Sequence, residues 1–443
     1  MCNPNKVRTF APSKVRTLYM KTYNAHIIDT PTPKSFRFLE NGYVSVSDEG
    51  KVVYVGKQLP DSAGEVIDFG DRLLIPAFND LHLHAPQYRN NGLAMDLELL
   101  PWLQRYTFPE EMKFADIDYA RKIYKRFVHE LWMQGTMRSA VFATIHPEAT
   151  HLLANLLNQA GLGAYVGLVA MNRNAPNGLC NTTQEAFANT KELDAYLGRN
   201  GRVRAIITPR FIPSCSEDML TALGKLAAET GLPVQSHLSE NKHEIDWVHE
   251  LEPDATCYGD AYNRYGLFGQ TPTLMAHCCY TNDEETRLMR ENGVCIVHCP
   301  TSNNNLASGM APIRHFLNEG IQVALGTDIS GGHYMSMLRV IQYAIQTSKL
   351  HYAQSQGKMP FLSLSEAFYL ATKSGGAFFG KVGSFEVGYD FDALVIDDSY
   401  LNFDHYTLPE RIERFIYIGD DRDIRHRFCQ GQELSEPFKT TDQ

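Results

Sequence analysis

Residues 294–328 read VCIVHCPTSNNNLASGMAPIRHFLNEGIQVALGTD, and this stretch shows the pattern that decides the fold. An almost continuous apolar run, 294–299, is followed by a segment of helical character, 310–319, and then by a second apolar run, 322–327. Strands that are apolar throughout are typical of a parallel sheet with both faces covered. The stretch therefore predicts a strand–helix–strand unit of a parallel α/β fold.

The same alternation extends along most of the chain. A strand that runs into His82 comes first, and the other predicted strands are 138–143, 163–170, 203–208, 233–237, 273–278, 294–299 and 322–327. The helices predicted between and after them are 110–134, 147–160, 183–198, 216–230, 241–251, 282–292, 310–319 and 334–347. Eight such units in roughly 250 residues favour a (β/α)8 TIM-type barrel over a doubly wound sheet.

Both ends of the chain are rich in predicted strands instead. Residues 43–47 and 51–55 alternate apolar and polar side chains around a turn, which predicts a hairpin, and 388–396 is strand-like again after a last helical region, 363–380. We expect the two ends to pair into one small discontinuous β-sandwich domain. The predicted divisions are 1–75 and 381–443 for this β-domain, and 76–380 for the barrel.

The composition excludes several classes of protein. The 443 residues would by length alone suggest about three domains, and 44% hydrophobic with 21% charged residues is ordinary for a globular chain. A net charge of −10 argues against binding a nucleic-acid polymer through its phosphates. No apolar run is long enough for a membrane span, and residues 1–8 lead into no apolar signal-peptide region. With nine cysteines in no regular framework, we expect a cytoplasmic protein with reduced thiols and no membrane partner.

Side chains that bind metals stand at the ends of four predicted strands. His82 and His84 end the first strand, and residues two apart on a strand point to the same face. His237 ends the fifth strand, His277 the sixth and Asp328 the eighth. Catalytic groups of such barrels lie at the carboxyl ends of the strands, so these side chains should converge on one mouth. Several imidazoles and one carboxylate suit a catalytic zinc or a related divalent metal, with a position left for water.

Each of these residues alone has a structural explanation. A single His near a strand end is more often hydrogen-bonded than metal-bound, and an Asp after Gly-Thr is often a helix N-cap. Glu240, three residues after His237, could reach a substrate above the metal or could simply favour the start of helix 241–251 through the helix dipole. The recurrence at four strand ends favours the metal site, whereas these arguments leave the role of Glu240 open.

The proposed ligands also resemble a known family. They follow one order along the chain: His82-x-His84, His237, His277 and Asp328. This order is similar to that of the amidohydrolase superfamily, whose members share a metal-dependent distorted barrel and a flanking β-domain. The His237–Glu240 spacing resembles its deaminase branch, which typically uses one metal. Binuclear members often carry a carboxylated Lys at the end of the fourth strand, but 206–210 contains no Lys.

Longer motifs narrow the resemblance to the guanine deaminases. The matching stretches are His84-Ala85-Pro86-Gln87-Tyr88, 95–100, 106–111, Arg210-Phe211, 236–240, 298–303 and 326–328. They extend from about residue 76 to 345, nearly the whole predicted barrel. Ala77 replaces the Gly that usually follows Pro76, and Asn79 is polar where an apolar residue is common. Both departures lie outside the ligand set.

The resemblance implies catalytic roles. The metal ligands would be His82, His84, His237 and Asp328. They would hold one zinc ion per subunit, with Fe²⁺ as the alternative. Glu240 would protonate ring nitrogen N3 of guanine while hydroxide attacks C2, and His277 would orient the attacking water while Asp328 takes its proton. Ammonia would leave and xanthine would remain.

The resemblance also implies a substrate site and partners. The residues against the substrate would be His84, Ala85, Pro86, Gln87, Arg210, Phe211, His237, Glu240, His277 and Asp328. Phe211 suits stacking on a purine, and Arg210 and Gln87 offer donors and an acceptor to its edge. Without the resemblance, a core Phe, a surface Arg and a loop Gln would be the preferred interpretation. Guanine is the implied small-molecule partner, and a homodimer is the implied assembly.

Two alternative functions stay open on the sequence. The chain could be another aminohydrolase of the same branch that acts on a different purine, a pyrimidine or a triazine, because these amidines share one mechanism. It could also be a binding or scaffold protein that kept the barrel without catalysis. Such a protein would be expected to lose metal ligands, and all four are present here.

Overall fold

The computed structural model describes residues 20–439. The outermost residues of the expected β-domain, 1–19 and 440–443, lie outside this part, and so does the stretch 1–8 that entered the prediction on signal peptides. Within 20–439, no helix combines the length and the apolar character needed to cross a membrane.

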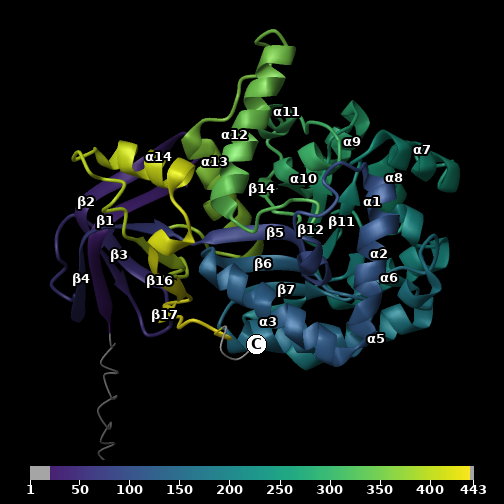
Figure 1. Cartoon of the computed structure of the whole chain (residues 1–443), viewed down its shortest axis with the longest axis horizontal. Helices are drawn as coiled ribbons and strands as arrows, with labels where there is room; N and C mark the ends of the chain where they lie inside the picture. Colours follow the sequence, from purple (N-terminus) through teal and green to yellow (C-terminus); the bar gives the residue numbers. More distant parts are fainter. Residues whose placement is uncertain (1–19, 440–443) are drawn as a thin grey trace, which may run out of the picture.

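Strands from the two ends of the chain form one seven-stranded sheet at one side of the molecule (Figure 1). In order across the sheet they are β17 (Gln432–Glu433), β16 (Ile424–Cys429), β15 (Ala393–Ile396), β4 (Glu65–Pro76), β1 (Lys21–Thr32), β2 (Ser35–Val46) and β3 (Val52–Gly56). Strand β4 joins the two ends, because it pairs with β1 along one edge and with β15 along the other. The predicted hairpin is confirmed, with Val44 opposite Val55.

The pairing of the two chain ends is therefore confirmed, but the described strands belong to one hydrogen-bonded sheet rather than to two facing sheets of a sandwich. The reason is the length of β4, whose 12 residues provide partners for both halves of the domain. Aromatic side chains fill the core of this sheet: the ring of Tyr23 lies 5.0 Å from that of Phe391 and 5.2 Å from that of Phe428. Such ring pairs stabilise a core beyond the area that they bury.

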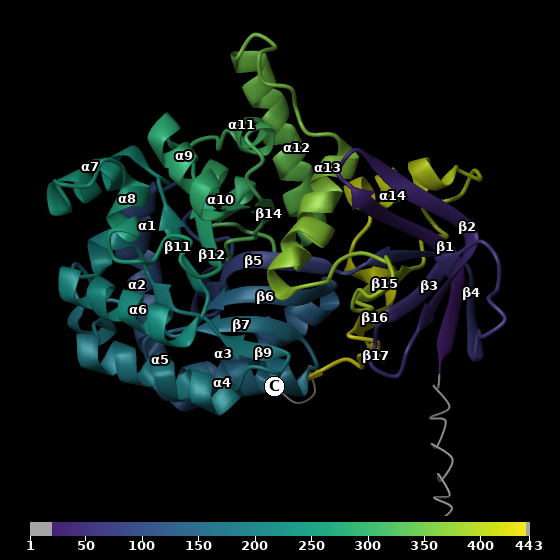
Figure 2. The same ribbon diagram turned by 180° about the vertical axis from the view of Figure 1, so that it is seen from behind.

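Two parallel four-stranded sheets form the centre of the larger α/β part (Figure 2). The first contains β5 (Phe78–His84), β6 (Thr136–Phe142), β7 (Gly163–Gly167) and β9 (Val203–Ala205). The second contains β11 (Val234–Leu238), β12 (Thr273–His277), β13 (Cys295–His298) and β14 (Val323–Leu325). Two of the predicted strands are divided, because β8 (Val169–Ala170) and β10 (Thr208–Pro209) pair with each other separately.

Backbone hydrogen bonds connect the two sheets at both margins. At one margin the Gln235 N–H donates to the Ile207 carbonyl at 2.9 Å. At the other the Asp328 N–H donates to the His82 carbonyl at 2.8 Å. The strands of the described chain nevertheless form two sheets and not one closed ring. The parallel α/β arrangement is confirmed, and ring closure is not resolved.

Helices alternate with the strands and cover their outer faces (Figures 1 and 2). The longer ones are α3 (Ile117–Met133), α4 (Pro147–Gln159), α5 (Thr183–Leu197), α6 (Glu217–Thr230), α7 (Lys242–Leu251), α9 (Asp283–Asn292), α12 (Met337–Gln354) and α14 (Leu408–Ile418). The shorter ones are α1 (Leu99–Trp102), α2 (Phe108–Glu111), α8 (Tyr258–Asn263), α10 (Pro300–Asn305), α11 (Ile313–Asn318) and α13 (Leu364–Tyr369).

Several predicted helix boundaries differ from the observed ones. The predicted helix 110–134 begins as α3 only at Ile117, because the Asp116 side chain caps the backbone N–H groups of Asp118 and Tyr119. The predicted helix 334–347 continues to the end of α12 and projects from the body in Figure 1. Short helices such as α8 and α10 were missed, since six residues are too few to show a helical period.

Candidate active site

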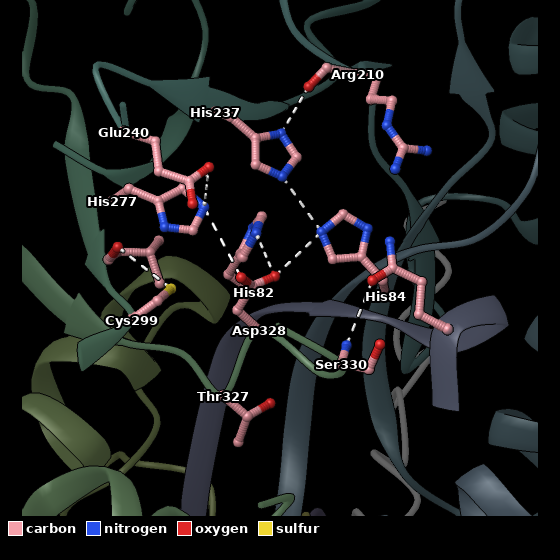
Figure 3. A network of polar contacts seen from close by, with 12 residues as sticks. His82, His84, Arg210, His237, Glu240, His277, Cys299, Thr327, Asp328 and Ser330 are labelled. Carbon is pink, nitrogen blue, oxygen red and sulfur yellow. Dashed lines mark hydrogen bonds and ion pairs between the residues drawn. The ribbon is translucent and has the colours of Figure 1, made fainter. Parts of the chain in front are cut away.

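The side chains that the sequence singled out as metal ligands come from separate strand ends and meet in one place (Figure 3). His82 and His84 close β5, His237 lies in β11, His277 ends β12 and Asp328 follows β14. Ligand atoms of His82, His84 and His237 all lie within 4.8 Å of one another, and the same holds for His82, His277 and Asp328. The parallel sheets thus bring together residues that are up to 246 positions apart, from 82 to 328.

The contacts within this group are short. Asp328 Oδ1 lies 3.2 Å from His82 Nε2 and 3.3 Å from His84 Nε2. His84 Nε2 lies 3.2 Å from His237 Nε2. Two neutral imidazoles can share such a contact only if one of them donates a proton. A cation between them would instead accept a lone pair from each ring, so the arrangement suits a metal ion.

The protonation states also suit a metal. Desolvation lowers the pKa of His82 to about 4 and holds the pKa of His237 well below its ordinary value, so both rings are neutral, as metal ligands must be. Burial favours the neutral acid of Asp328, yet the adjacent imidazoles of His82 and His84 hold its pKa well below the usual range. The His237 Nδ1–H donates to the Arg210 carbonyl at 2.6 Å, which leaves Nε2 free as a ligand.

An unpartnered nitrogen in this group also suits a bound metal ion. Nε2 of His82 is buried, and its contact with Asp328 Oδ1 does not have the alignment of a hydrogen bond, so within 20–439 this nitrogen has no hydrogen-bond partner. A buried polar atom without a partner is unfavourable, and binding a metal would satisfy it. Imidazole nitrogen and carboxylate oxygen are both ligand types that catalytic zinc uses. The residues present therefore fit zinc.

The backbone at the strand ends is strained where it turns these side chains into the site. Asp328 has φ 48° and His277 has φ 74°, in the left-handed region that non-glycine residues rarely adopt. Each such residue costs about 1–3 kcal/mol unless its surroundings hold it. Buried Asp80 supplies one such support, because it accepts hydrogen bonds from the Thr327 N–H at 3.0 Å and the His82 N–H at 3.3 Å. Asp80 thereby ties the ends of β5 and β14 together.

Glu240 and His277 lie next to each other beside the candidate metal ligands His82 and Asp328. His277 Nε2 lies 3.5 Å from Glu240 Oε2 and 4.0 Å from Asp328 Oδ2. The Ser308 hydroxyl donates to Glu240 Oε1 at 2.9 Å, and His277 Nδ1 lies 2.9 Å from Asn303 Oδ1. Burial raises the pKa of Glu240, whereas the two carboxylates raise the pKa of His277 against the effect of its own burial. A carboxylic acid with a raised pKa next to a polarising imidazole is suited to proton transfer.

A pocket of ≈ 420 Å³ opens onto these groups. Its lining consists of His84, Gln87, Leu99, Trp102, Leu103, Arg210, Phe211, His237, Glu240, Glu244, His277, Leu306 and Asp328. Most residues of the predicted substrate site are thus brought together here. Ala85 and Pro86 are buried at the start of the short 3₁₀ helix Ala85–Asn90 and do not line the pocket.

Five lining residues were missed by the sequence analysis. Leu99, Trp102 and Leu103 belong to the segment of α1 and the following π-helical turn, which covers the pocket. Trp102 is 3% exposed, and no described residue accepts a hydrogen bond from its indole Nε1. Only one sequence feature pointed to a segment over the pocket: the apolar residues of 99–103 cluster without the period of a helix or a strand.

Glu244 and Leu306 carried no usable signal. Glu244 accepts the Glu240 N–H at 3.1 Å and the Tyr258 hydroxyl at 2.7 Å, and burial raises its pKa to about 7. Glu244 also completes the capping box of α7 with Asn241. In the sequence it therefore looks like an ordinary helix-capping acid.

Comparison with known proteins gives consistent matches along the chain. The model of the amidohydrolase family matches residues 73–434. The guanine deaminase of Dictyostelium discoideum is 42% identical over 379 residues, covering 83% of this chain and 84% of that protein. The guanine deaminase of Homo sapiens is 35% identical over 429 residues, covering 91% and 94%. A crystal structure of guanine deaminase from C. acetobutylicum with guanine bound in its active site superposes with a TM-score of 0.92 at 51% identity, covering 94% of this chain and 100% of that one.

Proposed function

We propose that this chain, which belongs to the amidohydrolase family and within it to the guanine deaminases, hydrolyses guanine to xanthine and ammonia. The observation that carries the proposal is the convergence of three imidazoles, the Asp328 carboxylate and the Glu240 carboxyl on one pocket of ≈ 420 Å³. Small-molecule sites typically combine an apolar or aromatic lining with a few placed polar groups, and the pocket offers Phe211 together with Gln87 and Arg210.

The metal in this proposal is one zinc ion per subunit, held by His82, His84, His237 and Asp328. When bound there, zinc would supply an activated water for attack near neutral pH. Fe²⁺ is the alternative, since imidazole and carboxylate ligands also suit it. Elemental analysis of the purified protein distinguishes the two metals.

The protein side chains would move the protons. Glu240 donates its proton to N3 of guanine, which makes C2 more electrophilic. Burial raises the pKa of Glu240, so this carboxyl group keeps its proton available for the transfer. His277 orients the attacking water, and Asp328 accepts the proton that this water loses. That proton then reaches the leaving amino group, and the second proton of the water returns to Glu240 when the C2 hydroxyl becomes the carbonyl of xanthine, so one water is consumed and one ammonia is released.

Removal of the metal tests this function directly. Dialysis against a chelator is expected to lower the rate of conversion of guanine to xanthine at least about tenfold, and added zinc should restore it, because the ligands are buried but reach the pocket. The decrease of guanine absorbance in the ultraviolet measures the rate. Full activity in protein shown to be free of zinc and iron would contradict the proposal.

Substrate recognition would depend on Gln87, Arg210 and Phe211. Phe211 offers an aromatic ring, 8% exposed, from the pocket wall. Arg210 offers donors only, whereas the Gln87 amide offers both a donor and an acceptor. An aminopurine that turned an amino group toward Arg210 would set donor against donor, which favours guanine, with its carbonyl oxygen, over adenine.

Phe211→Ala is expected to raise the KM for guanine about tenfold and to change kcat less, because stacking and burial of the purine contribute binding rather than chemistry. Steady-state kinetics measure the two constants separately. Phe211→Tyr keeps the ring and should keep the KM within about threefold. An equal loss in both variants would assign the effect to packing and not to stacking.

The alternative substrates are other purines, pyrimidines and triazines, since they share the amidine chemistry. Ammonia release from adenine or cytosine without release from guanine would support that alternative. A scaffold function would require that the protein carry no stoichiometric metal.

We infer the finer architecture and assembly from the same family membership. The two parallel sheets would be halves of a distorted (β/α)8 barrel over 76–380, with the β-domain formed by 1–75 and 381–443. A homodimer is expected. Leu350 in α12 is 58% exposed, and Phe361, whose ring lies 5.4 Å from that of Tyr352 in the same helix, is 44% exposed, so these two side chains give the dimer a candidate interface. Light scattering tests the dimer.

The eight free cysteines of the described chain support a cytoplasmic location.

A further inference from the structure

Glu111 does not line the pocket, yet it joins two residues that we place against the purine. One of its carboxylate oxygens accepts a hydrogen bond from Gln87 Nε2 at 2.9 Å, and the other accepts from Arg210 Nη1 at 2.6 Å. All three side chains belong to residues that are at most 3% exposed. We propose that Glu111 is a positioning residue that fixes the orientation of the Gln87 amide and cancels the charge of Arg210, so that the pocket selects a neutral purine over a purine anion.

Hydrogen bonding to Glu111 fixes the orientation of the Gln87 amide. An ionised carboxylate only accepts, so the NH₂ group of Gln87 must face Glu111. The oxygen of the same amide then faces the Ser330 N–H, at 3.4 Å. A flipped amide would set oxygen against oxygen at Glu111 and donor against donor at Ser330. Glu111 therefore determines where Gln87 presents its remaining donor and its remaining acceptor to a ligand.

The second part follows from the charges. Arg210 and Glu111 pair with each other, and within 20–439 neither has another ion-pair partner. The Arg210 guanidinium also lies 5.4 Å from the centre of the Phe108 ring. Because the buried pair is neutral as a unit, Arg210 provides directed donors without a net positive charge that would attract an anion. This part rests on the proposed function, since it assumes that Gln87 and Arg210 contact the purine.

Glu111→Gln tests both parts with ligands of different charge. The variant leaves the charge of Arg210 uncompensated, so urate, a purine that is an anion at neutral pH, should inhibit about tenfold more tightly. The KM for guanine should rise about tenfold, because the Gln87 amide loses its fixed orientation and Arg210 loses its charged partner. Changes of opposite sign for the two ligands cannot come from a general loosening of the pocket, which would weaken both.

Glu110→Gln is the matched control. Glu110 is the adjacent residue, is 2% exposed, and pairs with Lys113 at 2.7 Å and with Arg89 at 3.4 Å rather than with a pocket residue. The ratio of urate inhibition to guanine KM should stay unchanged in this variant. Zinc content and thermal unfolding, measured for both variants, report whether either substitution disturbs the fold. The inference is overturned if Glu110→Gln and Glu111→Gln shift this ratio alike.

Arg210→Gln and the double variant separate this inference from the proposed function. If Arg210→Gln raises the KM for guanine but Glu111→Gln changes neither ligand, the inference fails and the proposed substrate contacts stand. If neither variant changes the KM, the proposed contacts fail as well. In the double variant the gain for urate should disappear, because no unpaired charge remains. This variant also restores the charge balance should Glu111→Gln fold poorly, and a persistent gain would contradict the charge argument.

Discussion

Glu240→Gln is expected to lower kcat for guanine about 10³-fold, within the range of about 10²–10⁴ that a general acid or base contributes. Gln has nearly the size of Glu and can still accept the hydrogen bond of 2.9 Å from Ser308 through its amide oxygen, so the pocket should keep its shape. It cannot donate a proton to N3 or accept one from the C2 hydroxyl. Ultraviolet kinetics on protein of measured zinc content give kcat.

Guanine binding should survive this substitution, because Glu240 acts on the substrate mainly by proton transfer. Equilibrium dialysis with the slow variant would measure the dissociation constant without turnover. Glu252→Gln is a matched control. Glu252 is also a buried acid, 7% exposed, but it does not line the pocket and accepts a hydrogen bond of 2.9 Å from the Tyr265 hydroxyl. A kcat for Glu240→Gln within tenfold of the parent protein would remove Glu240 from the proton path.

Much of the fold could be predicted because the parallel strands are short and apolar throughout. The runs that became β11 and β12 were recognised within one residue at each end, since every residue of β12 is buried and most of β11 is. Ring closure could not be read from the sequence, because it depends on backbone contacts such as that of Gln235 with Ile207. The single sheet of the β-domain was missed for the same reason: its shape depends on which edges of β4 are paired, and alternation of side chains does not encode that.

The candidate metal site could be located from the sequence because its side chains stand at strand ends and because His82 and His84 follow the period of two. The side chains that hold these residues in place could not be located from the sequence. Asp80 and Glu111 act through hydrogen bonds to residues that are remote in the chain, Thr327 and Arg210, and a carboxylate in the sequence does not reveal its partner. Trp102 lies in an irregular cover segment, where periodicity gives no orientation.

Asp328→Asn is expected to lower kcat/KM for guanine about 10⁴-fold or more, because one substitution removes a charged metal ligand and the proposed proton acceptor. The amide oxygen of Asn is neutral and a weaker ligand for zinc. The dissociation constant for zinc should therefore rise, and competition with a chromogenic chelator measures it. Zinc that is bound only to the folded state raises the free energy of unfolding, by about 2.7 kcal/mol when its free concentration is 100 times the dissociation constant. The zinc-dependent rise in melting temperature should thus shrink strongly in this variant.

The metal-free protein should also become less stable, but for a different reason. The adjacent imidazoles hold the pKa of buried Asp328 well below its usual range, so its charge stabilises the folded protein even when no cation is bound. Asn tolerates the φ of 48° at this position, so the backbone should not add to the loss. The metal-free Asp328→Asn variant should therefore unfold at a lower temperature than the metal-free parent, as measured by thermal unfolding at neutral pH. Asp392→Asn, which breaks the buried pair with Arg138, should likewise destabilise both forms but leave the zinc-dependent rise intact. A metal-free Asp328→Asn variant that unfolded at or above the temperature of the metal-free parent would show that the histidines do not stabilise the charge of Asp328.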